Sequence, residues 1–213
     1  MDPIIQNYPY LPFDELNYCH QHGILYQRDI SKSVDYDKHY FESYVRKAGT
    51  DIAKKLNVGR AAITEKYCDS LLDIGVGSGE FIKESGLLVY GFDINPVAIK
   101  WLREGDIYRD PYHYMPQVDG LTFWDSLEHI PNPTELLNQV RKDMFLFVSI
   151  PIFTDLLWVK KSKHYKPDEH YYYYTAQGLM TYMNDSGFET TEISDHETRA
   201  GREDILTFVF KKR

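Results

Sequence analysis

The sequence predicts an α/β fold built on a doubly wound, mostly parallel sheet, and three observations support this prediction. From residue 70 to residue 150, short apolar runs alternate with segments of helical period, as they do where helices join parallel strands. A glycine-rich turn, Gly75 to Gly79, directly follows the first apolar run. Asp93 follows the next apolar run, twenty positions after Asp73. Acidic residues at such positions are typical of nucleoside-binding βαβ units.

The N-terminal third has a different pattern. Residues 1–34 contain three prolines and little periodicity, so we expect an irregular arm that lies on the domain. Apolar residues recur at three- and four-residue steps over about 36–56, which predicts an amphipathic helix. A further short helix is expected at 61–67. We therefore divide the chain into an N-terminal arm and helical lid, 1–67, and a main domain, 68–213.

The remaining chain is assigned from its alternating periodicity. In order, we expect a strand at 70–74, a helix at 79–85, a strand at 87–92, a helix at 96–104, a short strand at 106–110, a strand at 118–124, a helix at 133–141 and a strand at 144–150. An insertion-like stretch follows Pro151. Thr175 then opens a helix that ends near Gly187, a residue suited to a left-handed cap. Two β-like runs, 189–194 and 204–210, complete the chain.

Length and composition limit the classes of protein that fit. A chain of 213 residues accommodates one α/β domain with an elaboration. No apolar run approaches the roughly 20 residues needed to cross a bilayer, and we see no secretory leader, so we expect a cytoplasmic protein without a membrane partner. The net charge of −8 disfavours a large nucleic-acid footprint, which needs clustered lysine and arginine.

The glycine spacing indicates which nucleoside the turn would bind. A dinucleotide fingerprint would need glycine at position 80, where Glu80 stands. The pattern is instead D-x-G-x-G-x-G, and it resembles motif I of the class I S-adenosylmethionine-dependent methyltransferases. The resemblance covers about residues 68–213. It implies a Rossmann-like, seven-stranded sheet closed by an antiparallel C-terminal hairpin, with an N-terminal helical extension, and S-adenosylmethionine as the cofactor.

Eight residues form the expected cofactor site. Glycine allows backbone to touch a ligand without an intervening Cβ, and the Asp93 carboxylate can accept hydrogen bonds from a ribose diol. The resemblance implies that Asp73 reaches the methionine end of the cofactor, and that an acidic residue after the third strand contacts the adenine amino group. We assign the latter role to Asp110 rather than Asp106, because Pro111 ends the strand there. The cofactor set is Asp73, Gly75, Gly77, Gly79, Asp93, Ile94, Asp110 and Trp124.

Two loops that contain Glu-His pairs are the expected catalytic elements. Glu128-His129 follows the strand at 118–124, at the edge where open α/β sheets bind ligands. It resembles the fourth motif of the ubiquinone-biosynthesis-type methyltransferases, and the Pro-x-Glu-His segment ending at His170 resembles a loop beside their active site. We expect the loops to converge, with Glu128, His129 and His170 catalytic. His129 is the general-base candidate. Alternatively, Glu128 and His129 only hold the loop in place.

A metal site is the other interpretation of these residues. Asp125, Glu128 and His129, with His164 or His170, could bind a divalent ion, a layout that resembles plant small-RNA 2′-O-methyltransferases and some quinone O-methyltransferases. Those enzymes have glutamate where Asp125 stands. Carboxylate and imidazole ligands suit Mg²⁺, Mn²⁺ and Zn²⁺ alike. We expect a cluster that positions substrate, and we assign no metal.

The sequence therefore predicts a methyltransferase that acts on an oxygen, nitrogen or carbon nucleophile of a small or medium-sized acceptor. Two alternatives stay open. A nucleic-acid methyltransferase would need a basic groove, which the net charge disfavours. A non-catalytic S-adenosylmethionine-binding regulatory protein would be free to lose the acidic and glycine residues, and the intact pattern counts against it.

Overall fold

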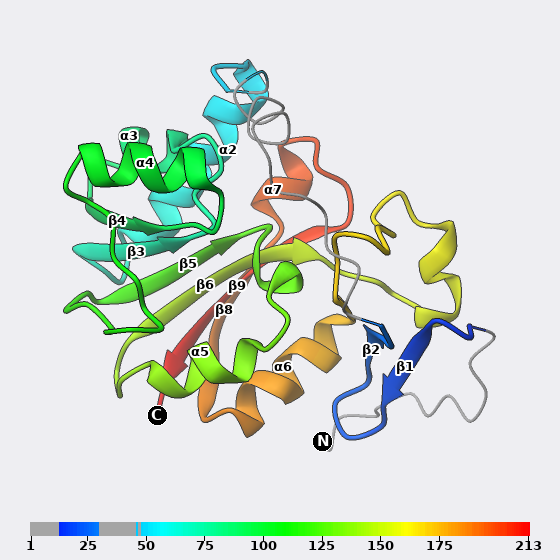
Figure 1. Ribbon diagram of the computed structural model, residues 1–213. Helices are drawn as coiled ribbons and strands as arrows, with labels where there is room; N and C mark the ends of the chain where they lie inside the picture. Colours follow the sequence, from blue (N-terminus) through cyan, green and yellow to red (C-terminus); the bar gives the residue numbers. More distant parts are fainter. Residues whose placement is uncertain (1–12, 30–45, 47) are drawn as a thin grey trace.

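The computed structural model describes residues 13–29, 46 and 48–213. Its principal sheet has six strands in the order β4-β3-β5-β6-β9-β8 (Figure 1). Their bounds are β3 Ser70–Ile74, β4 Leu88–Phe92, β5 Gly120–Trp124, β6 Phe145–Pro151, β8 Phe188–Ser194 and β9 Ile205–Lys212. Strands β4, β3, β5 and β6 are parallel, and β9 runs antiparallel to both β6 and β8. The doubly wound sheet and its antiparallel C-terminal hairpin are confirmed.

The expected strand at 106–110 is reduced to a single bridge, so the sheet has six strands rather than seven. Tyr108 pairs with Gly91 of β4 in parallel. The Gly91 amide donates to the Ile107 carbonyl at 2.9 Å, and the Arg109 amide donates to the Gly91 carbonyl at 3.0 Å. Asp106 has a φ of 56°, outside the extended region, and Pro111 has no amide hydrogen to continue the ladder. The segment is extended only between these two residues.

Helices cover both faces of the sheet. Their bounds are α2 Asp51–Thr64, α3 Glu80–Glu84, α4 Pro96–Glu104, α5 Pro133–Gln139, α6 Ala176–Asp185 and α7 His196–Arg199. Leu136 of α5 and Leu179 of α6 belong to the core formed on one face with Phe123. Ile63 of α2 and Phe81 of α3 belong to the core on the other face. None of the helices in the described ranges is long and apolar enough to cross a membrane.

Helix α2 corrects the predicted helices at 36–56 and 61–67. Residues 36–45 lie outside the described part of the chain. Thr50 caps the helix, its hydroxyl accepting from the Ala53 amide at 3.2 Å, so the predicted 36–56 helix is interrupted there. No break follows at 57–60, and α2 continues to Thr64. Gly59 lets the helix approach the ring of His196. An added Cβ there would lie 2.5 Å from that ring.

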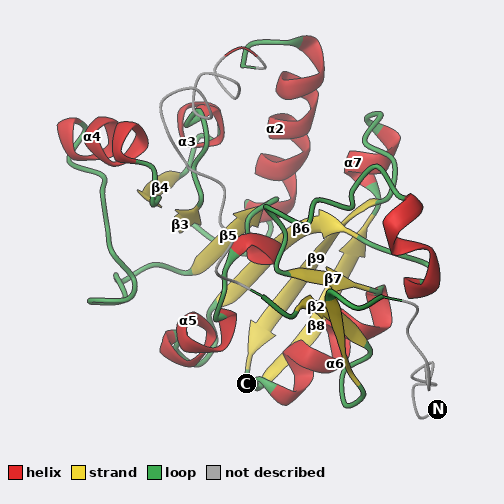
Figure 2. Cartoon of the chain, turned by 45° about the vertical axis from the view of Figure 1, so that its right-hand side comes forward, coloured by secondary structure: helices red, strands yellow, loops and turns green. Residues whose placement is uncertain are grey.

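A second, three-stranded sheet corrects the expectation that residues 1–34 are irregular throughout. Strands β1, Leu16–Cys19, and β2, Ile24–Gln27, form a hairpin, and β2 pairs antiparallel with β7, Tyr172–Tyr174 (Figure 2). Gly23, with a φ of 67°, makes the turn. Leu16 and Leu25 are buried with residues of the insertion after β6, which includes the 3₁₀ helix η2, Leu156–Lys161. The hairpin forms because this insertion covers its apolar side chains.

Candidate active site

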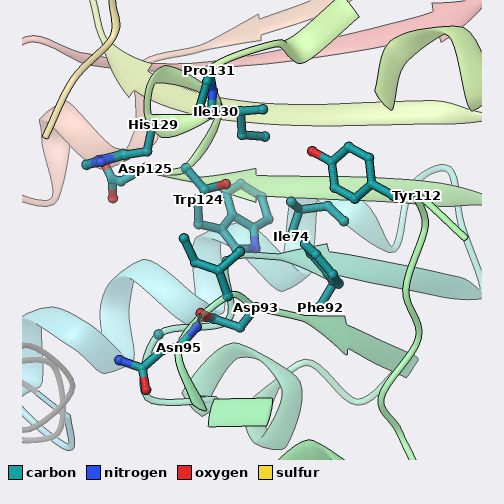
Figure 3. Close-up of a pocket in the computed structure, with 14 residues that line it drawn as sticks. Ile74, Phe92, Asp93, Asn95, Tyr112, Trp124, Asp125, His129, Ile130 and Pro131 are labelled. Atoms are coloured by element: carbon teal, nitrogen blue, oxygen red, sulfur yellow. Dashed lines mark hydrogen bonds between the residues drawn. The ribbon is translucent and has the colours of Figure 1, made fainter. Parts of the chain in front are cut away.

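A cleft lies at the carboxyl ends of β3, β4 and β5, and it encloses about 890 Å³ including open solvent (Figure 3). Six of the predicted site residues line it: Gly75, Gly77, Asp93, Ile94, Trp124 and His129. Among the lining residues that the sequence did not indicate are Phe92, Asn95, Tyr112, Ser126 and Ile130. The strand ends therefore bring most of the predicted cofactor set to one cavity.

The glycines of the turn after β3 have different structural roles. Gly75 has a φ of 81°, and a Cβ there would lie 2.8 Å from the Cβ of Ser126, another residue of the lining. Gly79 has a φ of 74° and begins α3. It does not line the cleft, and a Cβ there would lie 2.5 Å from the Trp101 ring. Gly75 is thus needed for the shape of the cleft, and Gly79 for the packing of α3 against α4.

Asp93 joins the end of β4 to the glycine turn. Its Oδ1 accepts from the Asn95 amide at 2.8 Å. Burial raises the pKa of its carboxyl above the usual range, while backbone hydrogen bonds from Asn95, Gly77, Ile94 and Val76 act in the opposite direction. The carboxylate is therefore fixed in orientation by main-chain donors at the wall of the cleft.

Asp73 lies behind this wall rather than in it. The residue is 1% exposed, and its Oδ1 accepts from the Thr122 hydroxyl at 2.7 Å. Burial raises the pKa of Asp73 to about 7, and the Thr122 hydrogen bond only partly offsets this effect. A buried carboxyl of this kind can hold either a proton or a nearby cation.

Asp110, the predicted adenine contact, does not line the cleft. Its Oδ1 accepts from the amides of Tyr112 at 3.0 Å and His113 at 3.4 Å, which stabilises a turn. That turn places Tyr112 in the lining. An aspartate that bonds to amides two and three residues later is a common local turn motif, and it was the signal available in the sequence. Trp124 does line the cleft, and it packs edge-on against Phe81.

The two Glu-His loops converge as the sequence predicts. Glu128 and His129 lie in the 3₁₀ helix η1, Leu127–His129, and His170 lies in the insertion after β6. The rings of His129 and His170 meet edge-on with centroids 4.7 Å apart. The Tyr171 amide donates to the Glu128 carbonyl at 2.8 Å and joins the loops. Glu169, by contrast, points to Lys166, at 3.1 Å.

Burial governs the protonation of this cluster. It raises the pKa of Glu128 well above the usual value, and the nearby Asp125 charge adds to the increase. Burial lowers the pKa of His129, partly offset by Glu169. It also lowers the pKa of His170, to about 3, and His129 contributes to the decrease. Both imidazoles are therefore neutral near pH 7 and able to bind a proton or another Lewis acid through a ring nitrogen.

Asp125 and His164 do not join this cluster. Arg202 donates to both carboxylate oxygens of Asp125, each at 2.8 Å. Arg60 lies 3.5 Å from Asp125 and donates to the fully buried Glu197 at 2.7 Å. The His164 ring instead lies 3.0 Å from the Glu203 carbonyl. The Arg60–Asp125–Glu197–Arg202 network was missed, because its members come from α2, the β5 end and the β8–β9 connection, with no local motif to link them.

A model of the methyltransferase domain family matches residues 36–193. The chain belongs to this methyltransferase family. A comparison with curated proteins finds no match to the sequence. Family membership confirms the enzyme class that motif I predicted.

Solved structures of methyltransferases share the fold. An S-adenosylmethionine-dependent methyltransferase from Archaeoglobus fulgidus has a TM-score of 0.60 at 20% identity, over 82% of this chain and all of that one. The magnesium protoporphyrin IX methyltransferase of Synechocystis, solved with S-adenosylhomocysteine, has a TM-score of 0.58 at 17% identity, over 84% and 96% of the two chains. A 1,6-didemethyltoxoflavin-N1-methyltransferase from Burkholderia thailandensis has a TM-score of 0.52 at 16% identity, over 93% and 99%. These likenesses confirm the class I, S-adenosylmethionine-dependent methyltransferase fold.

Proposed function

We propose that this methyltransferase transfers the methyl group of S-adenosylmethionine to an oxygen, nitrogen or carbon nucleophile of a small or medium-sized acceptor. One observation carries the proposal: the Gly75–Gly77 backbone, Asp93 and His129 line the same cleft at the strand ends. A nucleoside seated on the glycine backbone and Asp93 would have its reactive end near His129.

The cofactor fits the residues of this cleft. Asp93 would accept hydrogen bonds from the ribose hydroxyls, and the Gly75–Gly77 backbone can approach the ligand without an intervening side chain. Ile94 and Tyr112, both in the lining, offer apolar surface for the adenine. Asp73 would face the methionine ammonium, which supplies the cation that its buried carboxyl lacks. We assign Asp110 to the local turn that it forms with the amides of Tyr112 and His113, and not to the adenine.

His129 lines the cleft and would face the acceptor, and Glu128 and His170 are buried next to it. In the transfer, a lone pair of the acceptor forms a bond to the methyl carbon as the carbon–sulfur bond breaks, and the released pair turns the sulfonium into a neutral thioether. The cofactor supplies this chemistry, so the protein mainly aligns the two reactants and excludes water. The buried imidazoles are suited to positioning an acceptor or taking its proton.

A small acceptor is supported by the charge of the chain and by its structural neighbours. The net charge of −8 disfavours the phosphate contacts of a nucleic-acid substrate. Two of the neighbours act on small molecules, 1,6-didemethyltoxoflavin and magnesium protoporphyrin IX, according to their names. The ubiquinone-biosynthesis-type branch stays a prediction from the motifs.

We further propose that residues 1–67 shape the acceptor side as a lid. The described part of this segment reaches the site through the β1–β2 hairpin, where the Gln27 amide donates to the Tyr171 carbonyl at 2.8 Å. Tyr171 directly follows His170. Residues 1–12, 30–45 and 47 of the expected lid lie outside the described part of the chain.

Calorimetric titration with S-adenosylmethionine, S-adenosylhomocysteine and NAD tests the proposal. Binding of both sulfur nucleosides with one site per chain, and no heat with NAD, is the expected result. If neither sulfur nucleoside bound, the proposed function would be wrong.

A further inference from the structure

Glu128 is a buried carboxyl whose charge the surrounding residues do not match. It is 2% exposed, and neither of its carboxylate oxygens has a hydrogen-bond partner among the described residues. The neighbouring cations already have acidic partners: Arg60 and Arg202 face Asp125 and Glu197, and Lys166 faces Glu169. A buried, unpaired carboxylate is costly, so this site needs either a proton or a cation.

Two imidazoles stand next to this carboxyl. One potential ligand atom from each of Glu128, His129 and His170 can be chosen so that all three lie within 4.8 Å of one another. Metal–ligand bonds of about 2.1 Å separate tetrahedral ligands by about 3.4 Å. Small side-chain rotations would therefore bring the three onto one ion. Two histidines and one carboxylate form a recognised ligand set for Zn²⁺ and Fe²⁺ enzymes.

The surroundings of His129 also favour its use as a metal ligand. Its ring makes a hydrogen bond with the backbone of Glu169. A metal-bound histidine almost always donates its other ring N–H to such an acceptor, which fixes the tautomer and directs the free nitrogen to the ion. Asp125 adds no fourth protein ligand, because Arg202 occupies both of its oxygens. Among the described residues the protein thus supplies three ligands, and the remaining coordination positions would be open to another molecule.

We propose that Glu128, His129 and His170 bind a divalent transition-metal ion of the Zn²⁺, Mn²⁺ or Fe²⁺ type at the edge of the cleft. The paired imidazoles favour such ions over Mg²⁺ and Ca²⁺, which prefer oxygen ligands. His129 lines the cleft, so the open positions lie beside it.

One consequence rests on the proposed function. An oxygen of the acceptor bound to the ion would lie next to the methyl group, and the ion would lower the pKa of that hydroxyl. In that case the acceptor is an alcohol or phenol. His129 then acts as a ligand, and not as the general base that the sequence suggested.

Metal binding can be measured without knowing the acceptor. Chelator-treated protein is titrated with Co²⁺ and followed by its visible absorption, and with Zn²⁺, Mn²⁺ and Mg²⁺ by calorimetry. The variants are Glu128→Gln, which keeps the side-chain volume, and His170→Gln. His164→Gln is the matched control, since His164 lies in the same insertion but outside the cluster. Thermal unfolding of each variant confirms that it is folded.

We expect one Co²⁺ or Zn²⁺ per chain in the wild type and in His164→Gln. The affinity for Co²⁺ and Zn²⁺ should fall at least about tenfold in Glu128→Gln and in His170→Gln. Even the loss of a residue that only hydrogen-bonds to a metal ligand costs this much metal affinity. No binding by the wild type, or unchanged binding by folded Glu128→Gln and His170→Gln, would overturn the metal site. In that event Glu128 is simply protonated.

Titration of S-adenosylhomocysteine in the same samples separates this inference from the proposed function. Metal binding without nucleoside binding would support the ion site and refute the transfer activity. Nucleoside binding without metal binding would support the proposed function and refute the ion site.

Discussion

Arg202 donates to both carboxylate oxygens of Asp125 at 2.8 Å, joining the β8–β9 connection to the end of β5 beside the cleft. The bidentate geometry outweighs burial and keeps the pKa of Asp125 below its usual value. Asp125 has a left-handed φ of 55°, and it immediately precedes the loop that carries Glu128 and His129. The pair therefore fixes the direction in which that loop leaves the sheet.

Arg202→Met should destabilise the protein by about 3 kcal/mol, because it leaves Asp125 and the buried Glu197 with Arg60 as their shared cation. Chemical denaturation would measure the change. Arg199→Gln on α7 is the control, since its ion pair with Asp195 is exposed and should contribute less than about 1 kcal/mol. Equal effects of the two substitutions would contradict the role given to the network.

Asp93→Ala should weaken S-adenosylhomocysteine binding by roughly 100-fold. Two hydrogen bonds to a charged group are lost, together worth about 3 kcal/mol. Calorimetry gives the affinity, and Asp110→Asn serves as the control outside the cleft. If Asp110→Asn cost as much affinity as Asp93→Ala, the placement of the nucleoside would need revision.

Asp73 should make the protein less stable as the pH rises from about 4 to 7. Its carboxyl titrates at about 7 in the folded state and near 3.8 when unfolded. The stability that the Asp73 carboxyl contributes is fully present below pH 4, where the folded and the unfolded protein both hold the proton. It falls as the unfolded state ionises and is lost by about pH 7, a change on the order of 4 kcal/mol.

Urea denaturation of the wild type and Asp73→Asn across this pH range isolates the effect. Asparagine can still accept the Thr122 hydrogen bond but does not ionise. The difference in stability between the two proteins should therefore change by several kcal/mol between pH 4 and pH 7. A difference that stays constant would show that Asp73 titrates normally.

Gly75→Ala should cost more stability than Gly49→Ala. Both glycines have left-handed φ values, 81° and 73°, so both variants carry a backbone penalty of about 1 kcal/mol. Only at Gly75 does the new Cβ meet a neighbour, the Cβ of Ser126 at 2.8 Å; at Gly49 nothing lies within 4 Å. We expect about 3 kcal/mol for Gly75→Ala in denaturant titrations. Equal losses would rule out a steric need for glycine at the cleft.

The sequence predicted the sheet well, because its signals are local. The strand at 70–74 has the predicted bounds, and the positions of Gly75 and Asp93 follow from the order of the strands and turns. Convergence of His129 and His170 could be expected because both follow parallel strands that end at the same edge of the sheet.

Features that depend on tertiary contacts were not predicted. The β1–β2 hairpin forms because the insertion after β6 buries its apolar side chains. Asp110 was expected at the cleft, but it accepts from the amide of Tyr112 in a local turn that places Tyr112 there instead. Arg202 and Asp125 lie 77 positions apart, and no periodicity connects them.

The crystal structure of the complex with S-adenosylhomocysteine tests the central claim most directly. The account predicts that the ribose hydroxyls lie within hydrogen-bond distance of Asp93 and that the sulfur faces the Glu128, His129 and His170 cluster. A nucleoside bound elsewhere, or bound here with its sulfur directed away from His129, would contradict it.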